Sequence, residues 1–266
     1  KNAAEIIGSL VEEFGQGGNC QMMGNFAFDT GLLVADINEA YVINCAGKNW
    51  AAKKVDDIFA ISNRYQIKDD WNLSSLKIKN GKKDNFNELF ENTELSEGVC
   101  ASVRENRAFK ILKENKGKIS LNTMADIMRD VGEDSENYEP DKAELKQNLV
   151  CMHAKPHPDA FWHATGAMIT DSNEDGIIVW MTGSAANDLS IFKPLFFNIP
   201  LPNQLSCLPR GTYDSKSYWW KHEKLHRRAI INYKDLKPEI RNSFDEIERK
   251  FFSESPNLRK AGDKEK

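Results

Sequence analysis

The sequence predicts an α+β fold, in which helices cover antiparallel sheet. Two observations carry this prediction. Strand-like and helix-like runs are segregated along the chain: a strand block, a helical block, further strands and a closing pair of helices. In addition, 40% of the 266 residues are hydrophobic, which is enough apolar material for one sizeable core or two small ones.

The first part of the chain predicts one helix followed by a meander of strands. Apolar residues recur at helical spacing over residues 2–15, and a glycine-rich run ends that pattern. Residues 29–36 and 40–46 are rich in Leu, Val, Ile and Tyr and are separated by a short polar turn, which predicts an antiparallel hairpin. Residues 50–55 and 58–63 are expected to continue the same sheet as short strands.

The middle of the chain predicts helices, a loop and a second group of strands. Helical spacing covers residues 84–92, 99–114 and 121–131, and strands are expected at 149–154, 165–170 and 177–182. Residues 132–147 are acidic and aperiodic, which favours a solvated loop over an acidic binding site.

Two helices close the chain, near residues 216–233 and 238–252. We therefore expect one folded region over residues 1–252 and a disordered tail over residues 253–266.

Charge and cysteine content exclude several classes of protein. Lys and Arg total 36 against 40 Asp and Glu, so no strong field attracts nucleic acid. The five cysteines are odd in number and widely spread, as expected of reduced thiols in a cytoplasmic protein. No apolar run is long enough for a membrane span. The first residue is Lys1, so we expect the true N-terminus to lie elsewhere.

Seven short segments, in the same order, resemble secernins and the related dipeptidases of peptidase family C69. They are residues 13–20 (EFGQGGNC), 46–52 (AGKNWAA), 61–64 (ISNR), 151–154 (CMHA), 165–168 (TGAM), 190–194 (SIFKP) and 219–227 (WWKHEKLHR). The resemblance covers the chain from residue 3 to about residue 250, and its gaps fall in the predicted loops.

The resemblance implies a four-layer αββα sandwich and a cysteine-type N-terminal-nucleophile hydrolase that acts on dipeptides or small amides without a cofactor. In such enzymes the α-amino group of a terminal Cys serves as the base, because an internal amide cannot accept a proton. Lys1 occupies the terminus here, so the nucleophile is expected to be absent and the chain inactive alone. A sandwich without its first strands would expose a sheet edge, and a homo-oligomer or aggregate is expected.

Asn63 is the best catalytic candidate among the residues present. The resemblance places an Asn at this strand end, where its amide can donate to a developing oxyanion. Without the resemblance, an Asn that caps a turn is the simpler interpretation. Arg64 is a candidate for binding a substrate carboxylate. His163 lies where many relatives carry Arg, and Asn44 departs from the family pattern, which affects the expected substrate preference.

Residues 222–226 spell H-E-x-x-H, the spacing of a zinc metallopeptidase with Glu223 as base. The rival hypothesis is zinc catalysis through His222 and His226, with Glu246 or Glu248 as third ligand. The metzincin extension is absent and the segment matches a family that works through Cys, so we favour a packed helix and expect no metal.

Two cysteines offer internal nucleophiles. Cys20 lies in a loop after a helix, without the strand context of a nucleophile. Cys151 and His153 alternate on a predicted strand and face the same way, but burial in a core strand is the simpler account. Secernins are also associated with exocytosis, so a second class of function is a non-catalytic protein that acts through partners.

Overall fold

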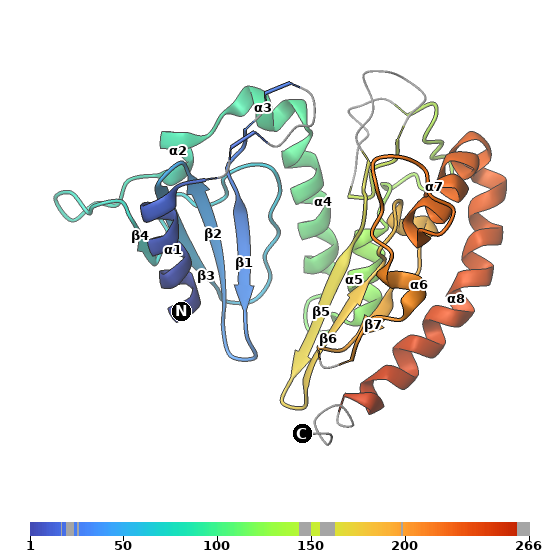
Figure 1. Cartoon of the computed structure of the whole chain (residues 1–266). Helices are drawn as coiled ribbons and strands as arrows, with labels where there is room; N and C mark the ends of the chain where they lie inside the picture. Colours follow the sequence, from blue (N-terminus) through green and yellow to red (C-terminus); the bar gives the residue numbers. More distant parts are fainter. Residues whose placement is uncertain are drawn as a thin grey trace. The chain divides into compact units, whose positions relative to one another are not determined.

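The computed structural model describes residues 1–16, 18–19, 24–25, 27–143, 150–154, 163–197 and 199–259. The chain forms two compact units, unit 1 at Lys1–Lys113 and unit 2 at Glu114–Lys266 (Figure 1). Each unit contains one antiparallel sheet and several helices, which confirms the α+β prediction.

Unit 1 contains one four-stranded sheet, in the order β1-β2-β3-β4. Its elements are α1 (Asn2–Phe14), β1 (Gly31–Ala35), β2 (Ala40–Ala46), β3 (Asn49–Val55), β4 (Leu73–Ser74), α2 (Phe86–Phe90), α3 (Thr93–Gly98) and α4 (Ala101–Glu114). The first helix and first three strands lie where the sequence predicts them. Helices α2 and α4 lie within the predicted helical segments 84–92 and 99–114, whereas α3, which the side chain of Asn92 caps, lies between them and was not predicted.

The sheet of unit 1 has a hydrophobic core on each face, and alternate residues of β2 belong to the two cores. Tyr41, Ile43 and Cys45 face α1 in one core, whereas Val42 and Ala46 belong to a second core on the opposite face. Figure 1 shows α1 lying against β2 and β3.

The prediction of a strand over residues 58–63 is wrong, because β3 pairs with β4 instead. The chain from residue 58 to Leu73 is irregular, and the backbone N–H of Ile67 is bonded to the side chain of Asn44. A side chain therefore replaces a neighbouring strand as the hydrogen-bond partner of this segment.

Unit 2 contains one three-stranded sheet, in the order β5-β6-β7. Its elements are α5 (Leu121–Met128), β5 (Met168–Asn173), β6 (Gly176–Met181), the 3-10 turn η2 (Asn187–Leu189), β7 (Lys193–Leu195), α6 (Asn203–Ser206), α7 (Tyr218–Ala229), the 3-10 turn η3 (Ile230–Asn232) and α8 (Tyr233–Leu258). Ile169, Ile178 and Trp180 pack against residues of α5 and α8, which flank the sheet (Figure 1).

Two strand predictions in unit 2 need correction. Residues 150–154 of the expected strand 149–154 are described and are not in a strand, since Cys151 N and Ala164 N make isolated bonds instead of a ladder. The unpredicted strand β7 contains Pro194 opposite Trp180. Proline is compatible with this position because β7 is an edge strand of the three-stranded sheet and needs no donor on its outer side.

The last helix, α8, is longer than predicted at both ends. It begins at Tyr233 and includes Pro238, which was expected to start it, and it continues to Leu258. The predicted boundary at residue 253 therefore falls inside the helix, and residues 260–266 lie outside the described residues. No helix among the described residues combines the length and apolar character needed to cross a membrane.

Candidate functional site

In unit 1, the loop that carries Asn63 and Arg64 is tied to the sheet and to α4. Asn44 is buried on β2, and its side-chain oxygen accepts a hydrogen bond from the backbone of Gln66 at 3.0 Å. The side chain of Gln66 donates in turn to Glu105 of α4 at 2.8 Å. The departure from the family pattern at Asn44 thus has a structural role here.

Asn63 is exposed, and one contact orients its amide. Arg104 Nη2 donates to Asn63 Oδ1 at 2.6 Å. The oxygen is therefore occupied, while the NH2 group donates to no residue in the described part of the chain. An amide held by its oxygen leaves its donor end available, which is the chemistry that an oxyanion contact requires.

Arg64 is engaged in contacts within unit 1. Its Nη1 donates to Ser102 Oγ at 3.0 Å, and its Nε lies 3.8 Å from Glu105 Oε2. Its side chain is 31% exposed. A substrate carboxylate at Arg64 would therefore compete with Glu105.

Unit 2 contains a buried polar network with four of the five histidines in the chain. His153, His222 and His226 are buried, and the side chain of His163 is 12% exposed. The fifth, His157, lies outside the described residues. Buried polar groups cost free energy unless they have partners, so this concentration needs an explanation by contacts or by function.

Asp188 is the centre of the network. Cys151 Sγ donates to its Oδ1 at 3.2 Å, and His153 Nε2 lies 3.0 Å from the same oxygen. Tyr233 donates its hydroxyl to Oδ2, and Lys237 Nζ lies 3.5 Å from that oxygen. Burial alone would raise the pKa of Asp188, but His153, Lys237 and Tyr233 hold it far below its ordinary value. Asp188 is therefore ionised.

A row of side chains leads from Asp188 through His153 to α7. His153 Nδ1 lies 3.2 Å from His226 Nε2, and His226 Nδ1 lies 3.0 Å from Glu223 Oε2. Arg227 Nε donates to the other oxygen of Glu223 at 2.5 Å. Burial alone would raise the pKa of Glu223, but its hydrogen bonds to His226 and Arg227 outweigh burial and lower the pKa to about 2. A carboxylate thus stands at each end of the histidine pair.

Of the residues assigned to the hydrolase site from the resemblance, His163 is the one that lies in this network. Its Nε2 lies 3.8 Å from Glu223 Oε2, and its ring centroid lies 5.6 Å from that of His226. Asn63 and Arg64 belong to unit 1.

The two histidines of the H-E-x-x-H segment have different partners. His222 Nε2 lies 3.1 Å from Ser190 Oγ, whereas His226 contacts Glu223. Burial is the largest cause that lowers the pKa of His222, to about 4. A zinc metallopeptidase needs both imidazoles on one ion. The described structure does not place His222 in any group of converging metal-ligand atoms.

The third ligand required by the zinc hypothesis is also engaged elsewhere. Glu248 is buried and accepts from Arg129 at 2.6 Å and from the backbone of Phe192 at 2.8 Å. Glu246 is exposed on α8.

Two groups of side chains in unit 2 have atoms close enough together to hold a metal ion. One is Cys151, His153 and Asp188, and the other is His163, Glu223 and His226. In each group the three potential ligand atoms lie within 4.8 Å of one another.

The two buried cysteines, Cys45 and Cys151, do not resemble activated nucleophiles. Burial raises the pKa of Cys151 well above its ordinary value, and the nearby Asp188 raises it further. Burial likewise raises the pKa of Cys45 to about 11. A nucleophilic cysteine needs a lowered pKa and access to substrate. Cys20 lies outside the described residues.

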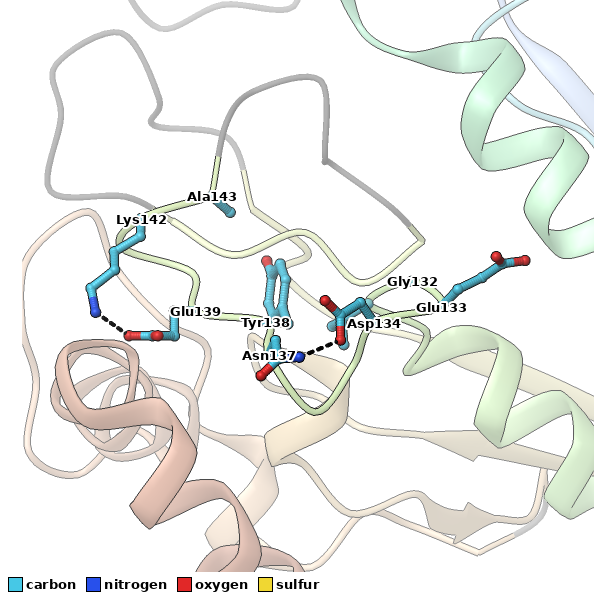
Figure 2. Close-up of a pocket in the computed structure, with 9 residues that line it drawn as sticks. Gly132, Glu133, Asp134, Asn137, Tyr138, Glu139, Lys142 and Ala143 are labelled. Carbon is cyan, nitrogen blue, oxygen red and sulfur yellow. Dashed lines mark hydrogen bonds and ion pairs between the residues drawn. The ribbon is translucent and has the colours of Figure 1, made fainter.

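A pocket of about 260 Å³ lies in the acidic segment that the sequence predicts as a solvated loop (Figure 2). Its lining is Val131, Gly132, Glu133, Asp134, Asn137, Tyr138, Glu139, Lys142 and Ala143. Tyr138 also belongs to the buried network, with its ring centroid 5.9 Å from that of His153 and 5.6 Å from that of Tyr233. Tyr138 therefore connects the pocket with the network.

Sequence reasoning missed Asp188, Tyr138 and Tyr233. One signal was available on α7, where the buried positions are His222, Glu223, His226 and Ala229. Polar residues thus occupy the helical positions that should face the core, which indicates a buried polar network.

A scan of the chain against models of known protein families finds no match.

Proposed function

We propose that the chain is part of a cysteine-type N-terminal-nucleophile amide hydrolase of the dipeptidase class, resembling secernins and peptidase family C69. In this proposal the nucleophilic Cys lies outside the 266 residues, and the chain supplies the surrounding site. The proposed substrates are dipeptides or other small amides, and the reaction needs no cofactor.

The observation that carries the proposal is that segments of the resemblance, far apart in the chain, are joined by buried side-chain contacts. Residues 151–154 meet residues 219–227 through His153 and His226, and residues 190–194 meet them through Ser190 and His222. Trp219 Nε1 also donates to the carbonyl of Thr165, in a fourth segment, at 3.2 Å.

The proposal includes a fold and a location. We propose an αββα sandwich for the complete protein, and the antiparallel sheet with helices against it in each unit supports this proposal. The free thiols of Cys45, Cys100, Cys151 and Cys207 support a cytoplasmic location, where disulfides are rare.

Asn63 is the proposed oxyanion donor. Attack of a thiolate on an amide carbonyl places negative charge on its oxygen, and a donor aimed at that charge acts mainly in the transition state. In the complete hydrolase, Asn63→Ala should lower kcat by about 10²–10³-fold with little change in KM. Arg64→Ala should act mainly on KM, if it holds a substrate carboxylate.

The test is dipeptide hydrolysis by the complete gene product and by residues 1–266 alone, with Ser62→Ala as a control in the same loop. Activity is expected only in the complete protein. Full kcat in Asn63→Ala would remove Asn63 from the site, and activity of residues 1–266 alone would place the nucleophile within them.

A second candidate is a non-catalytic protein that acts through partners in exocytosis. The burial of Cys45 and Cys151 is compatible with this candidate, because neither thiol is suited to attack a substrate, but it equally fits a nucleophile outside the 266 residues. A complete gene product whose mature chain does not begin with Cys would support this candidate and oppose the hydrolase.

A further inference from the structure

The buried row Asp188, His153, His226 and Glu223 is one hydrogen short when both imidazoles are neutral. Three contacts join these four groups, and each contact needs one hydrogen between its two atoms. Both carboxylates are ion-paired with basic side chains, so they only accept. Two neutral imidazoles supply two hydrogens, one from each ring. The third contact therefore requires either an excess proton or a metal ion.

The position of His163 favours the metal ion. A shared proton lies between two atoms only, whereas a metal ion needs a third ligand atom near the same two atoms. His226 Nδ1 lies 3.0 Å and His163 Nε2 lies 3.8 Å from Glu223 Oε2. Donor atoms around a tetrahedral zinc ion lie roughly 3.3 Å apart, given metal–ligand bonds of about 2.0–2.1 Å. The three atoms thus need only small side-chain shifts to bind one ion.

We propose that His163, Glu223 and His226 bind a divalent transition-metal ion, for which Zn²⁺ is the best match. Two imidazoles and one carboxylate form a recognised zinc donor set that leaves one position for water or another ligand. The site differs from an H-E-x-x-H zinc site, since His222 is not a ligand and Glu223 binds the ion. It also revises our expectation from the sequence that this segment binds no metal.

His153 and Asp188, which lie behind His226, complete the hydrogen bonds of the row when the ion is bound. With the ion on Nδ1 of His226, the Nε2–H of His226 donates to His153 Nδ1, and the Nε2–H of His153 donates to Asp188. Two neutral rings now satisfy every contact in the row. A second imidazole and a carboxylate behind a ligating histidine fix its tautomer and strengthen binding. Arg227 orients Glu223 through the oxygen that does not face the ion.

A metal site needs a path from solvent, and two of the three proposed ligands, Glu223 and His163, lie near the surface. Glu223 lines a pocket of about 320 Å³, together with Tyr213, Trp220, Lys224, Arg227 and Arg228. The side chain of His163 is also partly exposed.

The test measures binding of Zn²⁺, and of Co²⁺ as a spectroscopic probe, to the full chain and four variants. The wild type should bind roughly one ion, with the intense visible bands of tetrahedral Co²⁺ and no thiolate charge-transfer band. His163→Ala and Glu223→Gln should each weaken binding at least tenfold, and Glu223→Gln preserves shape, so it tests the ligand without emptying the core. His222→Gln, on the same helix, and Cys151→Ser should bind as the wild type does.

Three results would overturn the proposal. The first is a folded wild type without saturable metal binding, which would mean that an excess proton, not a metal ion, completes the row. Equal affinity in wild type, His163→Ala and Glu223→Gln would exclude these ligands. Loss of binding in Cys151→Ser, with a thiolate band in wild type, would place the ion at Cys151, His153 and Asp188.

Discussion

At the scale of single residues, Asp188 is a buried carboxylate with four polar partners. A thiol, an imidazole, a phenol and an ammonium group converge on its two oxygens in the interior. Such a buried carboxylate stabilises the fold mainly by accepting hydrogen bonds from these donors, because each donor would otherwise be buried without a partner.

Replacing Asp188 should therefore be strongly destabilising. Asp188→Ala should lower the free energy of unfolding by roughly 3–5 kcal/mol, the usual cost of removing one partner from a buried ion pair. Urea denaturation of the variant measures this loss. Asp235→Ala, at an exposed position on α8, is the control and should change stability far less. A loss in Asp188→Ala no larger than in Asp235→Ala would mean that the network is not formed.

Unit 2 should become more stable at alkaline pH, because the buried ammonium group of Lys193 loses its charge there. Burial lowers the pKa of Lys193 from 10.5 to about 8 in the folded chain. The unfolded chain therefore binds more protons between these two pKa values, so stability rises with pH through this window, and the cost of the buried charge is fully present below pH 8. The shift corresponds to at most roughly 3 kcal/mol.

The measurement for Lys193 is the free energy of unfolding at pH 7 and at pH 10 in wild type and Lys193→Met. The wild type should gain stability relative to Lys193→Met as the pH rises. Lys250→Met, at an exposed position on α8, should follow the wild type. Parallel pH curves for wild type and Lys193→Met would show that the Lys193 ammonium is not destabilised by burial.

At the scale of secondary-structure elements, α1 lies close to β3 because Gly8 has no side chain. A Cβ built on Gly8 would lie 2.2 Å from two ring atoms of Trp50. Trp50 is itself fixed, since its indole N–H donates to Glu12 of α1 at 2.7 Å. The Trp50 ring of β3 thus fills the space that the missing side chain of Gly8 leaves on α1.

Gly8→Ala should destabilise unit 1 by about 1–3 kcal/mol through overpacking, despite the better helix propensity of Ala. Gly98→Ala is the matched control, because it is also helical and a Cβ there meets nothing within 4 Å. It should be neutral or stabilise slightly. Thermal unfolding of both variants distinguishes the two effects, and equal behaviour would contradict the close packing of α1.

The elements that sequence predicts well are those with strong local patterns. The apolar stripe of α1 and the apolar run of β2 give their bounds almost to the residue. The strand predictions at 58–63 and around Cys151 failed because β3 pairs with β4 instead, and because the backbone of Cys151 bonds to Asp130, which no local pattern records. For the site, His163 and His226 were identifiable by residue type, but Asp188 joins them only through the tertiary fold.

At the scale of the whole molecule, the chain forms two compact units. The boundary at Lys113 lies near the end of α4, inside a predicted helix, so no change in composition marks it. Each unit has its own sheet and its own core, and in unit 1 strand β1 forms one edge of the sheet.

Strand β1 is the part of the chain most suited to self-association. It pairs with β2 on one side only, and Leu33 at its centre is 59% exposed. An edge strand with an exposed apolar side chain is a template for pairing with another chain, and a lysine at such a position opposes that pairing by its charge. We therefore expect residues 1–266 to form oligomers or aggregates, and Leu33→Lys to shift them toward the monomer.

Size-exclusion chromatography with light scattering tests this expectation. Leu208→Lys is the control, because it adds the same charge at an 82% exposed leucine outside the sheets. If general charge repulsion governs solubility, both variants should shift the distribution equally. If strand pairing governs it, only Leu33→Lys should do so, since it alone alters the edge. A sharp monomer in the wild type would contradict the prediction, because the edge of β1 would then need no covering by a second copy.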